Sequence, residues 1–167
     1  MAEISANHRG SLETAHDLLG LASKAGADAI KLQTYKPETM TLDLEEFSIS
    51  SDHQLWGGIT LFQLYAEAMT PWEWHKELFE HANELGMQAF SSPFDHSAVD
   101  FLEELNCPVY KIASMETGDV DLISYVASKG KPMIISTGAS TLDEIDAAVE
   151  AAEKVRDKLT LLVCTSS

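Results

Sequence analysis

The chain is poor in cysteine and in positive charge. Its 167 residues include two cysteines, Cys107 and Cys164, whose spacing fits neither a metal site nor a disulfide framework. The 11 Lys and Arg residues are outnumbered by 27 Asp and Glu, which gives a formal net charge of −16. Nucleic acids and anionic membranes both require a basic surface, so we expect neither as a partner.

Long apolar runs and phosphate-binding glycine motifs are also missing. No stretch approaches the roughly 20 apolar residues that cross a bilayer, and Met1 leads into AEIS without a leader peptide, so we expect a cytoplasmic protein. Neither GxGxxG nor GxxxxGK[ST] occurs, which argues against a nucleotide-binding sheet. The 6 histidines show no metal-ligand spacing. The apolar content of 45% is enough for one sizeable core.

Strand-like and helix-like segments alternate along the chain. Hydrophobic periodicity and turn residues predict strands at 2–5, 27–35, 87–92, 108–114, 132–137 and 159–166. The helices predicted between them are 11–25, 60–69, 70–86, 96–105, 120–129 and 141–156. Thr70 and Thr141 are each followed by Glu three positions later, as in a capping box. This alternation indicates a parallel sheet built from βαβ units.

Two architectures fit the alternation, a (β/α)8 barrel of TIM type and an open doubly wound sheet, and both gather function at the carboxyl ends of the strands. Strand alternation places Lys31 and Gln33 on one face and Ile30 and Leu32 on the other. A barrel explains such polar residues better, because its strands have an interior face. A complete barrel has eight strands in roughly 250 residues, so we expect an incomplete barrel of about six β/α units.

Two lysines lie at the centre of otherwise apolar strands, Lys31 in ADAIKLQTY and Lys111 in CPVYKIAS. A buried cation costs free energy unless it is paired or meets an anion. The two positions therefore indicate a pocket for a small, negatively charged substrate. The alternative is structural: Lys31 could reach the strand end and pair with Asp28 or Glu3.

Seven segments resemble, in order, successive motifs of the sialic acid synthase family: AEISANHRGS, GADAIKLQTYKPET, TPWEWHKELFEHA, FSSPFDHSAVDFL, YKIASMET, KPMIISTGAS and CTSS. The SANH, IKLQTY and TPWEWH elements are the most specific, and they favour the pseudaminic acid synthase branch. The resemblance implies that residues 1–167 are the N-terminal part of a single synthase barrel domain, without its C-terminal strands and without the small C-terminal domain of relatives.

The resemblance also implies a transferase. Such enzymes condense phosphoenolpyruvate with a six-carbon 2,4-diacetamido sugar aldehyde, giving a nine-carbon nonulosonic (pseudaminic) acid and phosphate. An N-acetylneuraminate or legionaminic acid synthase is the alternative within the family. A divalent Mn or Mg ion is expected to polarise the aldehyde, held by histidines of later strands, and the intact protein is expected to be a homodimer. From a different class, the chain alone could be a non-catalytic anion-binding module.

Roles for individual residues follow from the same motifs. Lys31 and Lys111 are expected to face the phosphate and carboxylate of phosphoenolpyruvate. Gln33 and Glu116 are expected to face the sugar, with Glu116 handling a proton and Glu3 as a second carboxylate near the pocket. The hydroxyl donors expected around the anion are Ser92, Ser114, Ser136 and Ser166.

Several of these residues have a structural alternative. Glu116 could serve only as a helix-start residue, Glu3 could only offset a lysine, and Ser136 could belong to a simple strand-to-helix turn. Trp56, Trp72 and Trp74 could stack on a sugar, but packing onto the sheet is favoured for the last two. The long 36–70 segment is expected to border the sugar site.

Overall fold

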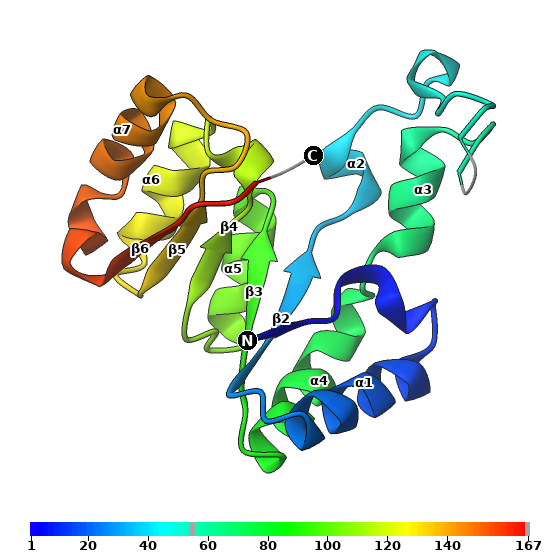
Figure 1. The fold of residues 1–167 in the computed structure, drawn as a ribbon, viewed down its shortest axis with the longest axis horizontal. Helices are drawn as coiled ribbons and strands as arrows, with labels where there is room; N and C mark the ends of the chain where they lie inside the picture. The colour runs from blue at the N-terminus through cyan, green and yellow to red at the C-terminus, as the bar shows by residue number, and fades with distance from the viewer. Residues whose placement is uncertain (54–55, 166–167) are drawn as a thin grey trace. The chain divides into compact units, whose positions relative to one another are not determined.

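The computed structural model describes residues 1–53 and 56–165. Over these residues strands and helices alternate as the sequence predicts, which confirms a chain of six β/α units of barrel type (Figure 1). The strands are β1 (Ala2–Glu3), β2 (Ala29–Thr34), β3 (Gln88–Pro93), β4 (Tyr110–Ile112), β5 (Met133–Ser136) and β6 (Leu159–Leu162). The α-helices are α1 (Leu12–Lys24), α2 (Pro37–Met40), α3 (Leu61–Ala68), α4 (Trp72–Glu84), α5 (His96–Glu104), α6 (Val120–Ser128) and α7 (Leu142–Ala151).

Four short 3-10 helices complete the described part of the chain, namely η1 (Ser5–His8), η2 (Glu45–Phe47), η3 (Ser114–Glu116) and η4 (Glu153–Lys158). The structure divides into two compact units, residues 1–88 and 89–167, which we describe in turn. That residues 1–167 form a single synthase barrel domain stays a prediction. Within the described ranges, no helix combines the length and the apolar character that crossing a membrane requires.

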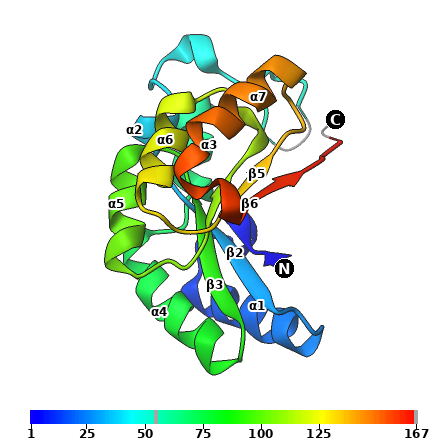
Figure 2. The same ribbon diagram turned by 90° about the vertical axis from the view of Figure 1, so that its left-hand side faces the viewer.

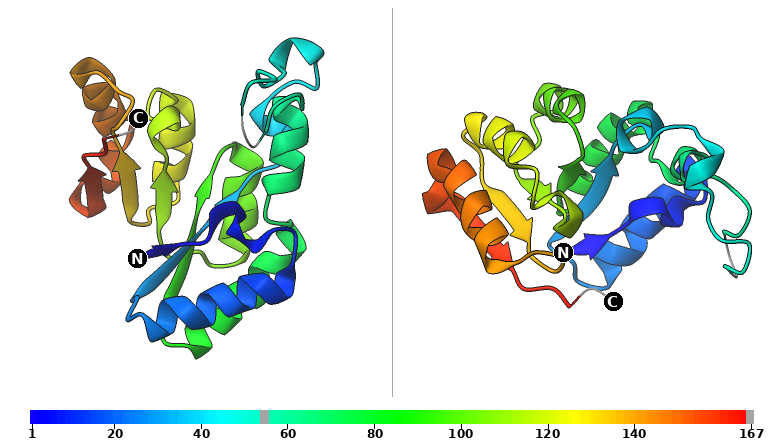
Figure 3. Two further views of the ribbon diagram at one scale, coloured as in Figure 1. Left: turned by 45° about the vertical axis from the view of Figure 1, so that its right-hand side comes forward. Right: turned by 90° about the horizontal axis from the view of Figure 1, so that it is seen from above.

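The first unit is built on two parallel strands, with Glu3 of β1 in register with Lys31 of β2. Burial alternates along β2: Ile30 and Leu32 are buried, whereas Lys31 and Gln33 are half-buried. This is the alternation that the sequence predicts for a strand with one core face. Helices α1 and α4 pack against each other in this unit, as the left view of Figure 3 shows.

Two local predictions in the first unit are wrong. The first strand ends at Glu3 rather than at residue 5, because Ser5 adopts a positive φ of 41° and begins η1. Thr70 does not cap helix α4, whose N-cap is Pro71 without a side-chain hydrogen bond. The Thr70 hydroxyl instead contacts Nε2 of the buried His8 at 3.3 Å, and a partner so distant in sequence cannot be read from a local motif.

The second unit carries four parallel strands that pair in chain order, β3 to β6. Helices α5, α6 and α7 lie along one side of these strands (Figure 2). The face that they cover is apolar, and Tyr110, Ile112, Met133 and Ile135 are completely buried there. This burial is the main source of stability for the unit, at roughly 1.5–3 kcal/mol for each large apolar side chain.

Side-chain caps start all three α-helices of the second unit. Asp95 caps α5 and Asp119 caps α6, and Thr141 with Glu144 forms the capping box predicted for α7. Each cap satisfies helix N–H groups that would otherwise lack a partner, worth about 1 kcal/mol.

Three boundaries in this unit differ from prediction. Helix α7 ends at Ala151 rather than near residue 156, because the chain continues as η4, in which the buried Val155 leaves helical geometry. Strand β4 ends before Ser114, which begins η3. Strand β6 ends at Leu162 rather than at residue 166. The packing of Val155 and the start of η3 set the first two boundaries, and neither changes the hydrophobic period.

Candidate functional site

The first unit brings Lys31 and Glu3 together. The two residues are register partners on adjacent strands, and the Lys31 ammonium forms an ion pair with Glu3 Oε2. The Lys31 side chain is 12% exposed and that of Glu3 is 40% exposed. Glu3 Oε1 also accepts hydrogen bonds from the Ser5 backbone N–H and hydroxyl, at 3.2 and 2.6 Å. The structural alternative for Lys31, pairing with Glu3, is therefore what the structure shows.

Gln33 lies two residues after Lys31 on the same half-buried face of β2. The alternation of the strand gives both side chains access to the side opposite the apolar core. The structure thus places Gln33 as predicted, and its expected contact with a sugar stays a prediction.

The turn after β1 is held by the buried His8. Its Nδ1 accepts a hydrogen bond from the Gly10 N–H at 3.0 Å, so in the neutral ring Nε2–H is left to donate to the Thr70 hydroxyl. The imidazole also makes an edge contact with the Trp74 ring, at 5.4 Å between centroids. Burial lowers the pKa of His8 and so favours this neutral form. The residue fixes the conformation of the turn, as a loop-orienting group does.

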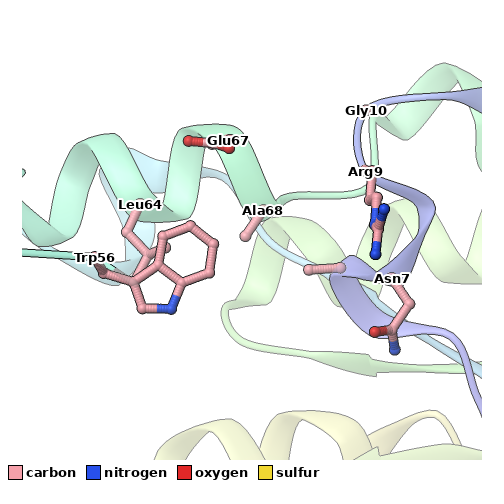
Figure 4. Close-up of a pocket in the computed structure, with 8 residues that line it drawn as sticks. Asn7, Arg9, Gly10, Trp56, Leu64, Glu67 and Ala68 are labelled. Carbon is pink, nitrogen blue, oxygen red and sulfur yellow. The ribbon is translucent and has the colours of Figure 1, made fainter. Parts of the chain in front are cut away.

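A cavity of about 660 Å³ opens beside this turn (Figure 4). It is lined by Ala6, Asn7, Arg9, Gly10, Trp56, Leu64, Glu67 and Ala68. Sequence reasoning singled out Trp56 and the long 36–70 segment but missed Asn7, Leu64 and Glu67. The unusual length of the segment was the available signal, and it could not name the residues that line a cavity.

The other two tryptophans, Trp72 and Trp74, make packing contacts inside the first unit, the alternative that the sequence favours over sugar stacking. Trp72 Nε1–H donates to the Tyr35 carbonyl at 3.0 Å, and the Lys36 ammonium lies 4.5 Å from the centre of its ring. Trp74 lies against His8. These contacts occupy both indole rings within the first unit.

In the second unit, strand register places three predicted site residues on one face. Ser91 pairs with Tyr110, so Ser92 lies beside Lys111, and Lys111 itself pairs with Ile134. Ser136 follows Ile134 by two residues and shares its face. The helices cover the opposite face. The sheet of this unit therefore presents an amine and two hydroxyls together, away from its apolar core.

Lys111 is deeply buried for a cation. It is 6% exposed, and its Nζ donates to the Ile112 carbonyl at 2.6 Å. Glu116 lies close enough to interact with this charge. Desolvation by burial raises the pKa of Glu116, while attraction to Lys111 opposes the rise. A carboxyl whose pKa is raised toward neutrality is suited to taking up and releasing a proton.

Three buried polar atoms of this unit lack an expected partner in the described structure, and two of them belong to predicted site residues; the third is Oδ2 of Asp95. Ser92 Oγ and Glu116 Oε2 are buried, and neither forms a hydrogen bond within the described residues. Buried polar atoms are nearly always paired, so each leaves room for a ligand or a water molecule. Both residues were predicted site residues, and this shared feature is the strongest structural mark of the candidate site.

The ends of β4 and β5 are tied together by hydroxyl groups. Ser114 Oγ accepts from the Gly138 N–H at 3.2 Å, and Thr117 Oγ1 donates to the Ser136 carbonyl at 2.6 Å. Thr117 is completely buried, and sequence reasoning missed it. Ser136 therefore also takes part in the strand-to-helix turn named as its alternative, through its backbone. Ser166 lies outside the described residues.

Within residues 1–53 and 56–165, no three His, Cys, Asp or Glu side chains are arranged to hold a metal ion. The ammonium, hydroxyls and carboxyl of the second unit are instead suited to a small organic anion and to proton transfer beside it.

Residues 18–167 match the model of the NeuB family, and the chain belongs to this family. It is 45% identical over its whole length to a pseudaminic acid synthase of Helicobacter pylori, of which it covers 49%. It is 34% identical over its whole length to an N,N'-diacetyllegionaminic acid synthase of Legionella pneumophila, of which it covers 48%. The chain thus spans about half the length of the curated relatives that it matches.

Among solved structures, the chain is similar to N-acetylneuraminic acid (sialic acid) synthetase from Leptospira borgpetersenii, solved in complex with citrate. The TM-score is 0.85 at 28% identity, over 99% of this chain and 53% of that one. The family resemblance read from the motifs is confirmed by these comparisons.

Proposed function

We propose that the protein carrying this chain is a transferase that condenses phosphoenolpyruvate with a six-carbon 2,4-diacetamido sugar aldehyde. The products are a nine-carbon nonulosonic acid, pseudaminic acid, and phosphate. The observation that carries this proposal is the polar face of the second unit, where Lys111 and Ser92 lie side by side and a buried Ser92 oxygen has no partner among the described residues.

Sequence identity to relatives with different products supports the choice of product within the family. The chain is 45% identical to the pseudaminic acid synthases of Helicobacter pylori and Campylobacter jejuni. The value is 34% for the legionaminic acid enzyme and 31% for a human N-acetylneuraminate-9-phosphate synthase. A pseudaminic acid precursor is therefore the favoured sugar, with the legionaminic and N-acetylneuraminic series as alternatives.

The proposed anion site follows from charge and hydrogen bonding. Phosphoenolpyruvate carries a phosphate and a carboxylate, which are best held by a desolvated cation and by hydroxyl donors. Lys111 supplies the cation, and Ser92, Ser114 and Ser136 supply the hydroxyls, with Ser166 proposed from its motif alone. The similar Leptospira protein was solved with citrate, itself a small polyanion. Lys31, Glu3 and Gln33 are proposed as substrate-facing groups from their motifs.

In the condensation, C3 of phosphoenolpyruvate forms a bond to the aldehyde carbon, and the aldehyde oxygen takes up a proton. Water adds at C2, and the C2–O bond to phosphate breaks to leave the keto acid. A proton must therefore move near the condensing carbons. Glu116 is the proposed proton carrier, because its pKa is raised by burial and its Oε2 has no partner in the described structure.

A divalent Mn or Mg ion is proposed to polarise the sugar aldehyde when bound. From the family resemblance we propose that its ligands are histidines of later strands, beyond residue 167. A homodimer and a cytoplasmic location are likewise proposed from the family resemblance.

The test is calorimetric titration of phosphoenolpyruvate into the full-length protein and into Lys111→Ala, followed by phosphate release with sugar and Mn. We expect binding by the parent, loss of binding in the variant, and phosphate release that requires the sugar. Binding without phosphate release for any amino sugar would instead indicate the non-catalytic anion-binding module. Equal binding by parent and variant would overturn the proposed anion site.

A further inference from the structure

None of the predicted catalytic or substrate-binding residues lines the cavity beside the turn after β1. It lies within the first unit, between residues 6–10 and helix α3, with Trp56 at one end (Figure 4). Its volume of about 660 Å³ falls inside the range of roughly 300–1,000 Å³ that is typical of small-molecule sites. The size alone admits a sugar or a part of one.

The two walls of the cavity are held in place by the fold. On one side, Arg9 and Gly10 have positive φ angles of 51° and 68°, and the buried His8 accepts the Gly10 N–H. A left-handed arginine is uncommon and persists where its surroundings determine it. On the other side, Thr60 and Gln63 form a capping box that starts α3. The lining side chains therefore project from preformed backbone.

The polar groups of the lining are of two kinds. The Arg9 guanidinium is exposed, and within the described residues it makes neither an ion pair nor a side-chain hydrogen bond. Asn7 donates its Nδ2–H to the Ile4 carbonyl at 2.8 Å. This bond leaves the amide oxygen of Asn7 as an acceptor for a ligand. Glu67 on α3 adds a carboxylate. The cavity thus offers a strong donor and two acceptors.

The remaining lining is apolar. Figure 4 shows the Trp56 and Leu64 side chains next to each other, Arg9 and Asn7 near each other at the other end, and Ala68 of α3 between them. The Glu67 carboxylate would repel a bare anion, and a hydrocarbon would offer no acceptor to the Arg9 guanidinium. A secondary amide with a methyl group matches all three kinds of surface, because it needs a donor, an acceptor and an apolar contact.

We propose that this cavity binds an N-acetylamino substituent of the acceptor sugar. Arg9 donates to the acetyl carbonyl oxygen, Glu67 accepts the amide N–H, and Leu64 and Trp56 contact the methyl group and the sugar ring. The inference rests on the proposed function for the identity of the sugar. It adds the residues that distinguish an acetamido group from a hydroxyl group, which none of the predicted lysine and serine positions would do.

The test compares two sugars in the full-length protein. The parent, Arg9→Gln and Glu67→Gln are assayed with the 2,4-diacetamido sugar and with an analogue that carries a hydroxyl in place of one acetamido group. We expect each variant to lower kcat/KM for the diacetamido sugar by about tenfold or more, and to leave kcat/KM for the hydroxyl analogue nearly unchanged. Arg156→Gln, at an exposed arginine of η4, is the matched control and should behave as the parent.

Two outcomes overturn the inference: kcat/KM for both sugars falling equally, or neither falling, in variants that bind phosphoenolpyruvate like the parent. Glu67 is exposed and belongs to α3 rather than to residues 6–10, so its variant tests the cavity without changing the Arg9 turn. If the parent releases no phosphate with any amino sugar, the proposed function fails separately. Binding of N-acetylmannosamine, followed by saturation-transfer NMR, then decides the inference: Arg9-dependent contact to the acetyl methyl supports it, and no such contact refutes it.

Discussion

The two units hold their strand-centre lysines in different ways. Lys31 of the first unit faces the Glu3 carboxylate in register and forms an ion pair with it. Lys111 of the second unit is more deeply buried, and its ammonium donates to the neutral carbonyl of Ile112. Glu116, a carboxyl that interacts with this charge, has a raised pKa rather than the lowered one of a tight ion-pair partner.

This difference separates a half-buried cation that is paired with a carboxylate across the sheet from a more deeply buried cation whose ammonium donates to a backbone carbonyl. An anionic substrate that approaches Lys31 must compete with the Glu3 carboxylate, which reduces the net attraction between Lys31 and the substrate. Lys111 has been desolvated by the fold, and its charge acts with little competition from solvent. A lysine in the middle of an apolar strand therefore does not by itself predict an anion site, because the groups around its ammonium decide how strongly it attracts a ligand.

The largest effect that we expect separates the two lysines directly. Lys111→Ala should weaken phosphoenolpyruvate binding by about a hundredfold to a thousandfold, and Lys31→Ala by only about tenfold. Calorimetric titration at constant salt measures both. Lys76→Ala, at an exposed lysine of α4, is the control and should bind like the parent. A larger loss in Lys31→Ala would reverse the comparison between the units.

The next effect is acid sensitivity of the first unit through His75. The ring is buried, with Nδ1 donating to the Pro71 carbonyl and Nε2 accepting from Thr34, and desolvation lowers its pKa to about 4. The unfolded chain takes up this proton near 6.5, so the contribution is complete above pH 6.5 and is lost as pH falls to about 4.

The expected loss over that interval is about 2–3 kcal/mol. Denaturant unfolding of the parent and of His75→Asn from pH 7 to pH 4 measures it, and the variant should show a flatter dependence. His53→Asn changes an exposed histidine and serves as the control. A parent whose stability is constant over this range would contradict the assigned environment of His75.

The second unit should respond to pH with the opposite sign. The pKa of Glu116 lies above its ordinary value of 4.5 because burial disfavours its charged form. Its contribution to stability is therefore present below pH 4.5 and is lost as pH rises through the folded-state pKa. Glu116→Gln should melt a few degrees higher than the parent at pH 7 and at the same temperature at low pH. Thermal unfolding followed by circular dichroism checks this, and a variant that is less stable at pH 7 would show that the charged form is favoured.

The smallest effect concerns two helix caps within the second unit. Asp95 Oδ1 caps α5, but its Oδ2 is buried without a hydrogen bond in the described structure. Asp119 caps α6 from an exposed position and has no such buried oxygen. Serine preserves a cap, so Asp95→Ser should be as stable as the parent or slightly more stable, and Asp119→Ser should match the parent within about 0.5 kcal/mol. Asp95→Ala should lose about 1 kcal/mol in the same urea titrations, and a comparable loss in Asp95→Ser would mean that Oδ2 has a stabilising partner.

Elements that depend on neighbours in sequence were predictable. The alternation of Ile30, Lys31, Leu32 and Gln33 follows from a period of two, and the Thr141 cap follows from Glu144 three positions later. Thr70 shows the same local pattern, but its hydroxyl contacts His8 instead. The shared Thr-x-x-Glu pattern gave different outcomes: Thr141 caps α7, whereas α4 has Pro71 as its N-cap and the Thr70 hydroxyl contacts a buried imidazole.

The candidate site divides in the same way. Ser92, Lys111 and Glu116 were available from motifs and from the cost of burying charge. Thr117, Asn7 and Glu67 were not, because a buried hydroxyl tie and the wall of a cavity arise from segments that are separated along the chain. No period or spacing in the sequence encodes which two segments enclose a space.

Local periodicity and motifs that keep their order were enough to predict the order of strands and helices, the polar face of β2 and the family. The tertiary structure decided which carboxylate neutralises Lys31, how deeply Lys111 is buried and where the Arg9 turn meets α3. The physical reason is that charge pairing, desolvation and cavities depend on distances in space, and the packing of distant segments sets those distances.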